Sequence, residues 1–267
     1  MNNTKPGYSV LPFRPQRRII MDAGRMGRRR HLVHGLVEFD VTEARQRLRA
    51  VKAAGQPLSF TAFIVVCLAQ ALTNSPLLHA YRNWRNQLIV FDDVDVVTLI
   101  EAERDGVAIP HIIRAANRKS VQAISQEIRA VQARPSTSSQ RSGVLARLGP
   151  YMPRFLRDAY FVALQRSPHQ LKQVAGTTVV TAVGMFARGS GWGFGFLPIH
   201  TLGLTLGGIA EKPAVLSGKI VIREFLCVTI SLDHDIADGA AAARFAGQLR
   251  GFIESAFGLE PAIPVNS

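Results

Sequence analysis

Apolar and polar positions follow two periods along this chain, and each period predicts one type of element. Stretches rich in β-branched residues, several of them alternating, predict strands. They lie at about residues 32–39, 87–91, 94–100, 177–184, 202–209 and 219–230. Apolar residues at helical spacing predict helices between them. These cover about residues 17–24, 42–54, 59–73, 120–133 and 240–253.

Short polar residues precede several of these helices, where a side-chain oxygen can accept a hydrogen bond from a free backbone N–H. The predicted N-caps are Thr42, Ser59 and Ser120. The run from Phe60 to Leu72 is the longest apolar stretch of the chain. It predicts a helix buried in the core, and it is too short to span a bilayer.

The strands and helices are interspersed without a regular βαβ repeat, which favours an α/β sandwich with a mixed sheet. Residues 1–16 are punctuated by prolines and predict an extended arm. Residues 17–267 are then interpreted as a single domain, since this length is not unusual for one α/β fold. The strands at 87–91 and 94–100 are predicted to pair with each other.

Composition narrows the class of protein. Hydrophobic residues make up 47% of the 267 residues, which excludes wholesale disorder. Cys67 and Cys227 lie in apolar runs, which favours two buried thiols over a disulfide framework. The first twenty residues contain no apolar signal-peptide core. We therefore expect an intracellular, cytoplasmic protein.

The formal net charge is +13, and basic residues cluster at 14–30 and 114–119. A surface for nucleic acid or anionic lipid is one interpretation, and a solvated basic face is the other. Aromatic residues are only 7% of the chain and do not alternate with the basic run. Base stacking therefore has little support, and we predict no specific nucleic-acid partner. Peripheral contact with a membrane stays open.

His234 and Asp238 follow the last predicted strand and precede an Ala-rich helix. They therefore lie on a strand-to-helix turn, where a rigid scaffold can direct a side chain into a cleft. Histidine titrates near neutral pH, which suits it to act as a general base. Asp238 stands at the start of the helix, so it can cap the helix or hold a buried ion pair.

The sequence His-x-x-x-Asp-Gly at 234–239 resembles the signature of the dihydrolipoamide acyltransferase catalytic domain of 2-oxoacid dehydrogenase complexes. Chloramphenicol acetyltransferases share this fold and pattern. The resemblance covers most of the chain in the same order. It includes the segments 17–20, 58–72, 92–96, 106–114, 176–186, 198–199, 206–209 and 212–213. It implies a chloramphenicol acetyltransferase-like two-layer sandwich.

The resemblance also implies a reaction, the transfer of an acyl group between two thiols. His234 would take the proton of the attacking thiol, and the hydroxyl of Thr181 would stabilise the oxyanion. The family aspartate at Asp238 typically pairs with an arginine that braces the site. The hydroxyl and the histidine of the family meet across a subunit boundary, so the resemblance implies a homotrimer.

Coenzyme A or an acyl-CoA thioester is the implied substrate, and a basic rim would attract its phosphates. Lipoamide carried on a separate lipoyl or acyl-carrier protein is a further implied partner, because we expect no lipoyl domain before the catalytic part. His31 and His34 have a spacing that some metal sites use, but no Cys or acidic pattern accompanies them. We predict no metal.

Asp235 and an expanded segment depart from the family pattern. Asp235 follows the histidine where the dehydrogenase-complex enzymes usually have arginine, and a carboxylate there favours the protonated base. The segment at about 135–175 is expanded. The glycine-rich run 189–195 lacks the context of a phosphate loop and is interpreted as a hairpin turn.

The expanded segment predicts one more helix, which Pro153 can open. Its predicted apolar face consists of Leu156, Tyr160, Ala163 and Leu164. The helix can pack on its own subunit, or it can form a lid or docking surface at the substrate channel.

Two alternatives to an active acyltransferase stay open at this point. The first is a catalytically inactive trimeric paralogue that acts as a binding or assembly protein. The second is a protein that associates with a membrane surface or with nucleic acid through its basic charge.

Overall fold

The computed structural model describes residues 4–5, 7–13, 17–28, 30–100, 109–134, 149–182 and 189–260. Its centre is a six-stranded sheet of order β3-β10-β9-β8-β6-β7. The strands are β3 (Leu32–Asp40), β6 (Val96–Ile100), β7 (Ile109–Ile113), β8 (Thr178–Ala182), β9 (Leu202–Leu216) and β10 (Lys219–Asp233). Strand β8 runs parallel to β6 and β9, and the other pairs are antiparallel. The predicted α/β sandwich with a mixed sheet is confirmed.

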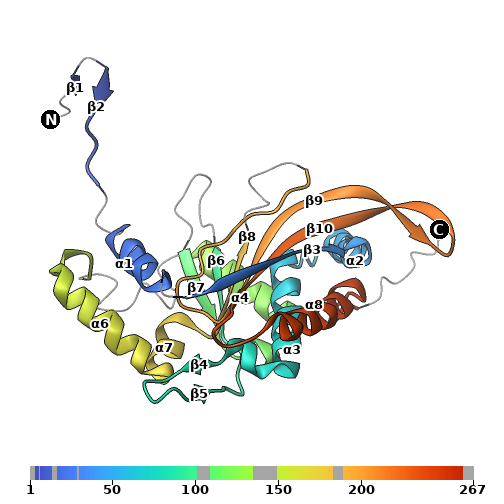
Figure 1. Ribbon diagram of the computed structural model, residues 1–267. Helices are drawn as coiled ribbons and strands as arrows, with labels where there is room; N and C mark the ends of the chain where they lie inside the picture. The colour runs from blue at the N-terminus through green and yellow to red at the C-terminus, as the bar shows by residue number, and fades with distance from the viewer. Residues whose placement is uncertain are drawn as a thin grey trace.

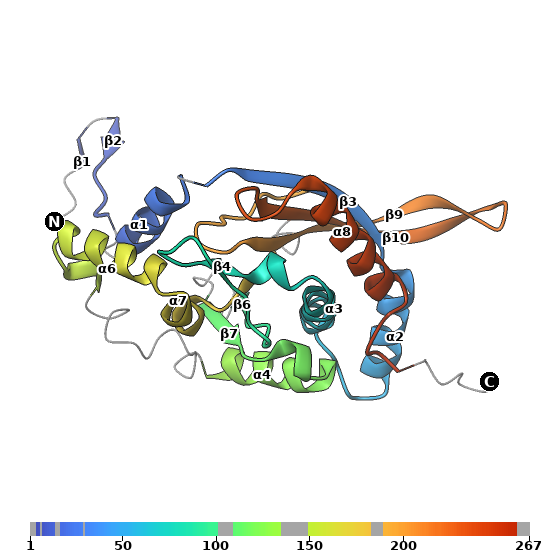
Figure 2. The same ribbon diagram turned by 60° about the horizontal axis from the view of Figure 1, so that its bottom comes forward.

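One face of the sheet is covered by helices, and these make the core (Figures 1 and 2). They are α2 (Thr42–Ala53), α3 (Phe60–Asn74), α4 (Val121–Ala133) and α8 (Gly239–Glu254). Helix α3 lies between α4 and α8, and ten of its residues are buried because almost every side of it is apolar. Ser59 caps α3 by accepting from the N–H of Ala62 at 3.3 Å, and Ser120 caps α4 in the same way, as predicted.

Thr42 was expected to cap α2, and this prediction is wrong. Val41 holds the cap position, and the carboxylate of Asp40 accepts from the N–H of Thr42 at 2.9 Å. The hydroxyl of Thr42 instead accepts from the backbone N–H of Glu224 on β10, at 2.8 Å. The side chain of Thr42, which the local pattern predicted to cap the helix, thus bonds to strand β10 instead.

The predicted pairing of 87–91 with 94–100 is also wrong. Strand β5 (Leu88–Ile89) pairs with β4 (Tyr81–Arg82) in a separate two-stranded sheet, and β6 pairs with β7. The buried carboxylate of Asp95 explains the difference, because it accepts hydrogen bonds from Arg114 at 2.8 Å and from the N–H of Ala115 at 2.9 Å. This attachment holds the start of β6 beside the end of β7.

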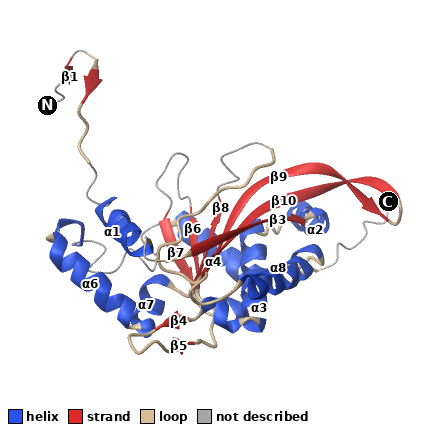
Figure 3. Cartoon of the chain, in the orientation of Figure 1, coloured by secondary structure: helices blue, strands red, loops and turns tan. Residues whose placement is uncertain are grey.

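Helices α1 (Arg17–Gly27), α6 (Arg154–Arg166) and α7 (Pro168–Ala175) form a second group beside the sheet (Figure 3). On α6 the buried side chains are Phe161 and Leu164, whereas Leu156 and Ala163 of the predicted face are exposed. The buried face differs from the predicted one because of the elements that pack against α6. Phe161 and Leu164 join Tyr81 and residues of α7 in a small second core.

A buried carboxylate joins α6 to α1. Asp22 on α1 is 2% exposed and forms ion pairs with Arg25 and with Arg157 of α6, the latter at 2.6 Å. Arg25 also reaches Asp158 at 3.1 Å. A buried charge with two partners is costly to break, so α6 is held firmly against α1.

Two apolar segments extend from the body of the protein. The hairpin of β9 and β10 projects beyond the sheet, and the arm with β1 (Thr4–Lys5) and β2 (Tyr8–Ser9) leaves from the opposite side (Figures 1 and 2). Each carries exposed large apolar side chains. They are Tyr8, Val10, Leu11 and Phe13 on the arm, and Val215, Leu216, Ile220 and Ile222 on the hairpin.

Gly176, which ends α7, provides a test of this packing. Its φ is +67°, and an added Cβ would lie 2.7 Å from the carbonyl oxygen of Asp95. Gly55 has φ +82° with open space around it. We expect Gly55→Ala to cost about 1 kcal/mol of unfolding free energy, from backbone strain alone. Gly176→Ala should cost about 2 kcal/mol or more, because the backbone contact adds to the strain. Equal losses in urea denaturation would contradict the close approach at Asp95.

Candidate active site

His234 is the first residue after β10, on the turn that leads to α8. Its backbone N–H donates to the carbonyl oxygen of His31 at 2.9 Å, which holds the turn against the start of β3. The imidazole is exposed, and within the described part of the chain it makes no hydrogen bond or ion pair. The side chain is therefore available to a ligand or to a second subunit.

Asp238 caps α8, with its carboxylate accepting from the N–H of Ala241 at 2.8 Å. The arginine partner that the family pattern implies for this position is not found there among the described residues. Another carboxylate holds an arginine instead. Asp233 is 3% exposed and lies 3.3 Å from Arg30, and Arg30 donates to the carbonyl oxygen of His200 at 2.7 Å.

Asp233 and Arg30 were missed by sequence reasoning. Arg30 belongs to a basic run that suggested a surface, and Asp233 stands among three acids within six residues. The only available signal was the burial expected of the last residue of a strand. In the structure Asp233 also accepts from the N–H of Asp235 at 3.2 Å, so this ion pair braces the turn on both sides of His234.

The carboxylate of Asp235 has a hydrogen-bonding partner other than His234. Its carboxylate lies 2.8 Å from Nδ1 of His31. The hydrogen bond and the charge of Asp235 raise the pKa of His31, and the same hydrogen bond lowers the pKa of Asp235. The carboxylate beside the candidate base is therefore engaged by His31.

Thr181 lies on β8 opposite Thr205 of β9, on the sheet face away from α3. A strap of residues 189–198 crosses this face, and the N–H of Gly195 donates to the hydroxyl of Thr205 at 2.9 Å. An added Cβ on Gly195 would come 2.8 Å from the methyl of Thr181 and closer still to the hydroxyl of Thr205. Only glycine lets the strap run this close to the candidate oxyanion donor.

The glycine run 189–195 is therefore not a hairpin turn, as we had expected. Residues 191–195 form no regular secondary structure and lie against the sheet, and the N–H of Gly208 donates to the carbonyl oxygen of Gly191 at 2.8 Å. A Cβ on Gly207 or Gly208 would collide with the strap backbone. Glycines in the strap and in β9 permit this close contact. The residue pattern of one segment alone does not reveal that the two segments meet.

The structure does not bring Thr181 and His234 together within one chain. Thr181 is in register with Thr205 and, through it, with Thr229 of β10. His234 lies five positions beyond Thr229 and two strand spacings from β8. Sheet geometry therefore separates their Cα atoms by roughly 19 Å. A single subunit does not complete the predicted pair.

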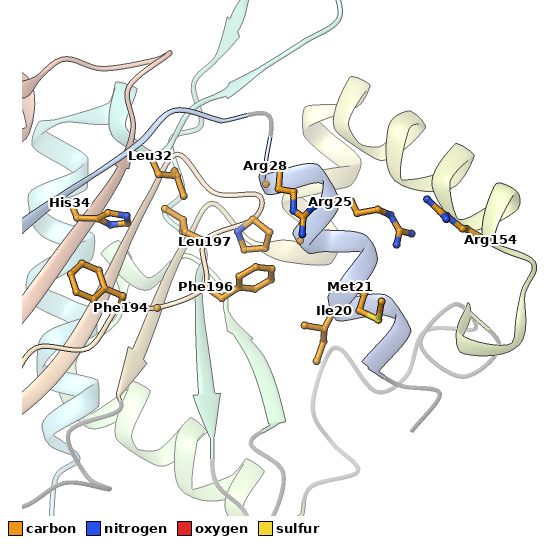
Figure 4. A pocket seen from close by; sticks show the side chains of 14 residues that line it. Ile20, Met21, Arg25, Arg28, Leu32, His34, Arg154, Phe194, Phe196 and Leu197 are labelled. Atoms are coloured by element: carbon orange, nitrogen blue, oxygen red, sulfur yellow. The ribbon is translucent and has the colours of Figure 1, made fainter. Parts of the chain in front are cut away.

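A groove of about 800 Å³ adjoins the strap, between α1, β3 and residues 194–198 (Figure 4). Phe194, Phe196 and Leu197 line it from the strap. A small hollow at Thr181 shares Gly195, Phe196 and Leu197 with the groove, so the two adjoin the same part of the strap. A smaller polar pocket of about 310 Å³ lies beside the turn of His234 and includes Arg30, Trp84, Asp233 and Asp235 in its wall.

Among the described residues, no group of three or more His, Cys, Asp and Glu side chains is arranged to hold a metal ion. No described helix has the length and apolarity to cross a membrane.

Comparison with known families gives one match over most of the chain. The model of the 2-oxoacid dehydrogenase acyltransferase catalytic domain matches residues 6–142 and 163–259. The unmatched residues 143–162 fall inside the predicted expansion and contain most of α6.

Curated relatives agree with this match. The chain is 24% identical over 226 residues to the lipoamide acyltransferase component of the branched-chain alpha-keto acid dehydrogenase complex of Bacillus subtilis, covering 82% of this chain and 46% of the relative. It is 27% identical over 213 residues to the dihydrolipoyllysine-residue acetyltransferase component of the pyruvate dehydrogenase complex of the same organism, covering 77% and 40%. The chain thus spans less than half the length of these two relatives.

Solved structures show the same fold. A probable dihydrolipoamide acetyltransferase from Listeria monocytogenes has a TM-score of 0.72 at 21% identity, covering 98% of this chain and 99% of that one. Dihydrolipoamide acetyltransferase from Azotobacter vinelandii has a TM-score of 0.72 at 18% identity, covering 92% and 91%. A chloramphenicol acetyltransferase has a TM-score of 0.52 at 17% identity, covering 88% and 94%.

The pair of His31 and Asp235 predicts how the turn responds to pH. The pKa of His31 is raised in the folded protein, so the pair adds stability at pH values below the unfolded-state pKa of about 6.5. This stability is lost as the pH rises through the folded-state pKa. The pKa of Asp235 is lowered in the folded protein, so the pair adds stability at pH values above the unfolded-state pKa of about 3.9. This stability is lost as the pH falls through the folded-state pKa. NMR titration should show the pKa of His31 falling toward 6.5 in Asp235→Asn. An unchanged pKa would refute the pairing.

Proposed function

Because the chain belongs to the family of 2-oxoacid dehydrogenase acyltransferase catalytic domains, we propose that it moves an acyl group from a coenzyme A-type thioester to a thiol or other small acceptor. One observation carries this proposal. Both acids beside His234 have partners, Arg30 and His31, while the imidazole between them is exposed and unpaired within the described chain. That arrangement suits a general base on a rigid turn.

In this mechanism His234 takes the proton from the acceptor thiol, and the thiolate attacks the thioester carbonyl. The hydroxyl of Thr181 donates a hydrogen bond to the oxyanion where its charge develops. Collapse of the tetrahedral intermediate breaks the bond to the coenzyme A sulfur, which takes the proton back from His234. Asp238 supports the reaction from the start of α8, where it fixes the helix that follows the turn.

A relative supports these assignments. The structure of the Azotobacter vinelandii enzyme comes from work on its catalytic mechanism, in which a serine, a histidine and an asparagine have roles. The present chain has a hydroxyl residue, a histidine and a carboxylate in the same order, at Thr181, His234 and Asp238.

We further propose a homotrimer, with Thr181 and His234 meeting across the subunit boundary. The separation of roughly 19 Å within one chain supports this arrangement. The exposed apolar residues of the arm and of the β9–β10 hairpin also support it, because large apolar patches typically mark contact surfaces. Lipoamide would reach such a site on a separate carrier protein.

Substitution of the base tests the function. His234→Ala should lower kcat about a hundredfold or more, because no other group removes the thiol proton. His169→Ala, at an exposed histidine on α7, is the matched control and should keep wild-type turnover. Acetyl transfer from acetyl-CoA to dihydrolipoamide, followed with both variants, is the measurement. Full activity in His234→Ala would reject the mechanism. A wild type that transfers nothing would favour an inactive binding or assembly paralogue.

Mixing two inactive variants tests the shared site. Thr181→Val removes the oxyanion donor and should lower kcat about a hundredfold. Co-expressed with His234→Ala, it should recover about a quarter of wild-type activity, as random mixing gives when each site uses one residue from each of two subunits. Light scattering should show a trimer and no larger shell. Mixed trimers without recovered activity would place both residues in sites of one subunit.

A further inference from the structure

The groove next to Thr181 has two chemically different ends. Figure 4 shows His34 and Phe194 toward one side and Arg25, Arg28 and Arg154 toward the other. The groove and the hollow at Thr181 are lined by the same strap residues, Gly195, Phe196 and Leu197. A molecule bound along it would therefore reach from the strap that lies on Thr181 to the arginines.

The wall of the groove near the strap is apolar and unusually exposed. Phe194 is 65% exposed and Phe196 is 59% exposed, and Ile20 and Met21 of α1 are each more than half exposed. Covering such side chains is favourable because it removes apolar surface from water. This wall suits an alkyl chain or a similar apolar body.

The arginine end carries excess positive charge. The charges of Arg25, Arg154 and Arg157 meet only two carboxylates, Asp22 and Asp158, which leaves one positive charge in the cluster. Asp158 lies 3.4 Å from Arg154, whose side chain is 69% exposed.

Arg28 adds a second positive charge. It is exposed and forms no ion pair with the residues that the structure describes. Among the described residues that line the groove there is no aspartate or glutamate. An anion at this end would therefore meet guanidinium groups without a competing carboxylate in the wall, and guanidinium binds carboxylates in paired hydrogen bonds.

Arg154 lies in residues 143–162, the segment that the family model leaves unmatched. Asp22 holds α6 in place through Arg157, so the position of Arg154 beside the groove is built into the packing of α1 and α6. The positive end thus combines Arg28 of the matched domain with Arg154 of the unmatched segment.

We infer that the groove selects an acyl acceptor with an apolar chain and a carboxylate end, and that Arg28 and Arg154 determine this specificity. The inference rests on the proposed acyltransferase function, since it names the acceptor class of the same site. The reactive thiol lies near Thr181, and the carboxylate lies between Arg28 and Arg154.

Dihydrolipoate and dihydrolipoamide test this inference, because they share one skeleton and differ in the charge of the far end. We expect wild-type kcat/KM to be at least about tenfold higher for dihydrolipoate, and the preference to shrink as salt screens the arginines. The double variant Arg28→Gln, Arg154→Gln should lose the preference through a lower kcat/KM for the acid. Arg244→Gln, at an exposed arginine on the helical layer, is the matched control and should retain the preference.

Calorimetric titration of both acceptors separates the two proposals. If no variant or wild type turns over either acceptor, the proposed function fails, and tighter binding of dihydrolipoate that depends on the two arginines still supports the groove. Equal affinity and equal kcat/KM for acid and amide would overturn the inference. So would a preference that survives in the double variant, or a groove closed to both molecules by a second subunit.

Discussion

The buried ion pair of Asp233 and Arg30 is the constraint on which the rest of the site depends. Asp233 ends β10, and its backbone N–H donates to the carbonyl oxygen of Thr201 at 2.8 Å. Arg30 reaches from the segment before β3 to the carbonyl oxygen of His200. Three segments far apart in sequence therefore meet around this ion pair. Removing one partner would leave a buried charge uncompensated, which typically costs 3–5 kcal/mol.

His234 takes its position from this junction. Its N–H is bound by His31, next to Arg30, while the N–H groups of Ile236 and Ala237 donate to the carbonyl oxygen of Asp233. The backbone around the imidazole is thus fixed by hydrogen bonds that do not involve the ring. A base held in this way keeps its full hydrogen-bonding capacity for a thiol, which is a requirement of the proposed reaction.

The other half of the site depends on close backbone contact. The strap of residues 189–198 lies on the sheet only because glycines meet glycines, and this contact forms the wall between Thr181 and the groove. Helix α6 adds Arg154 from the side, through the ion pairs of Asp22. The unmatched segment thereby adds a positively charged side chain to the lining of the groove.

Local pattern was enough to predict the sandwich, the buried helix after Ser59, the caps at Ser59 and Ser120, and the strand-to-helix turn that carries His234. These features depend on neighbours within a few residues, and periodicity records such neighbours directly. Only the tertiary structure decided that Thr42 bonds to β10, that β6 pairs with β7, and that Phe161 faces the second core. It also assigned Arg30 to Asp233 and His31 to Asp235. The partners in these contacts come from distant segments, and a charged or polar side chain does not reveal its partner by its own position in the chain.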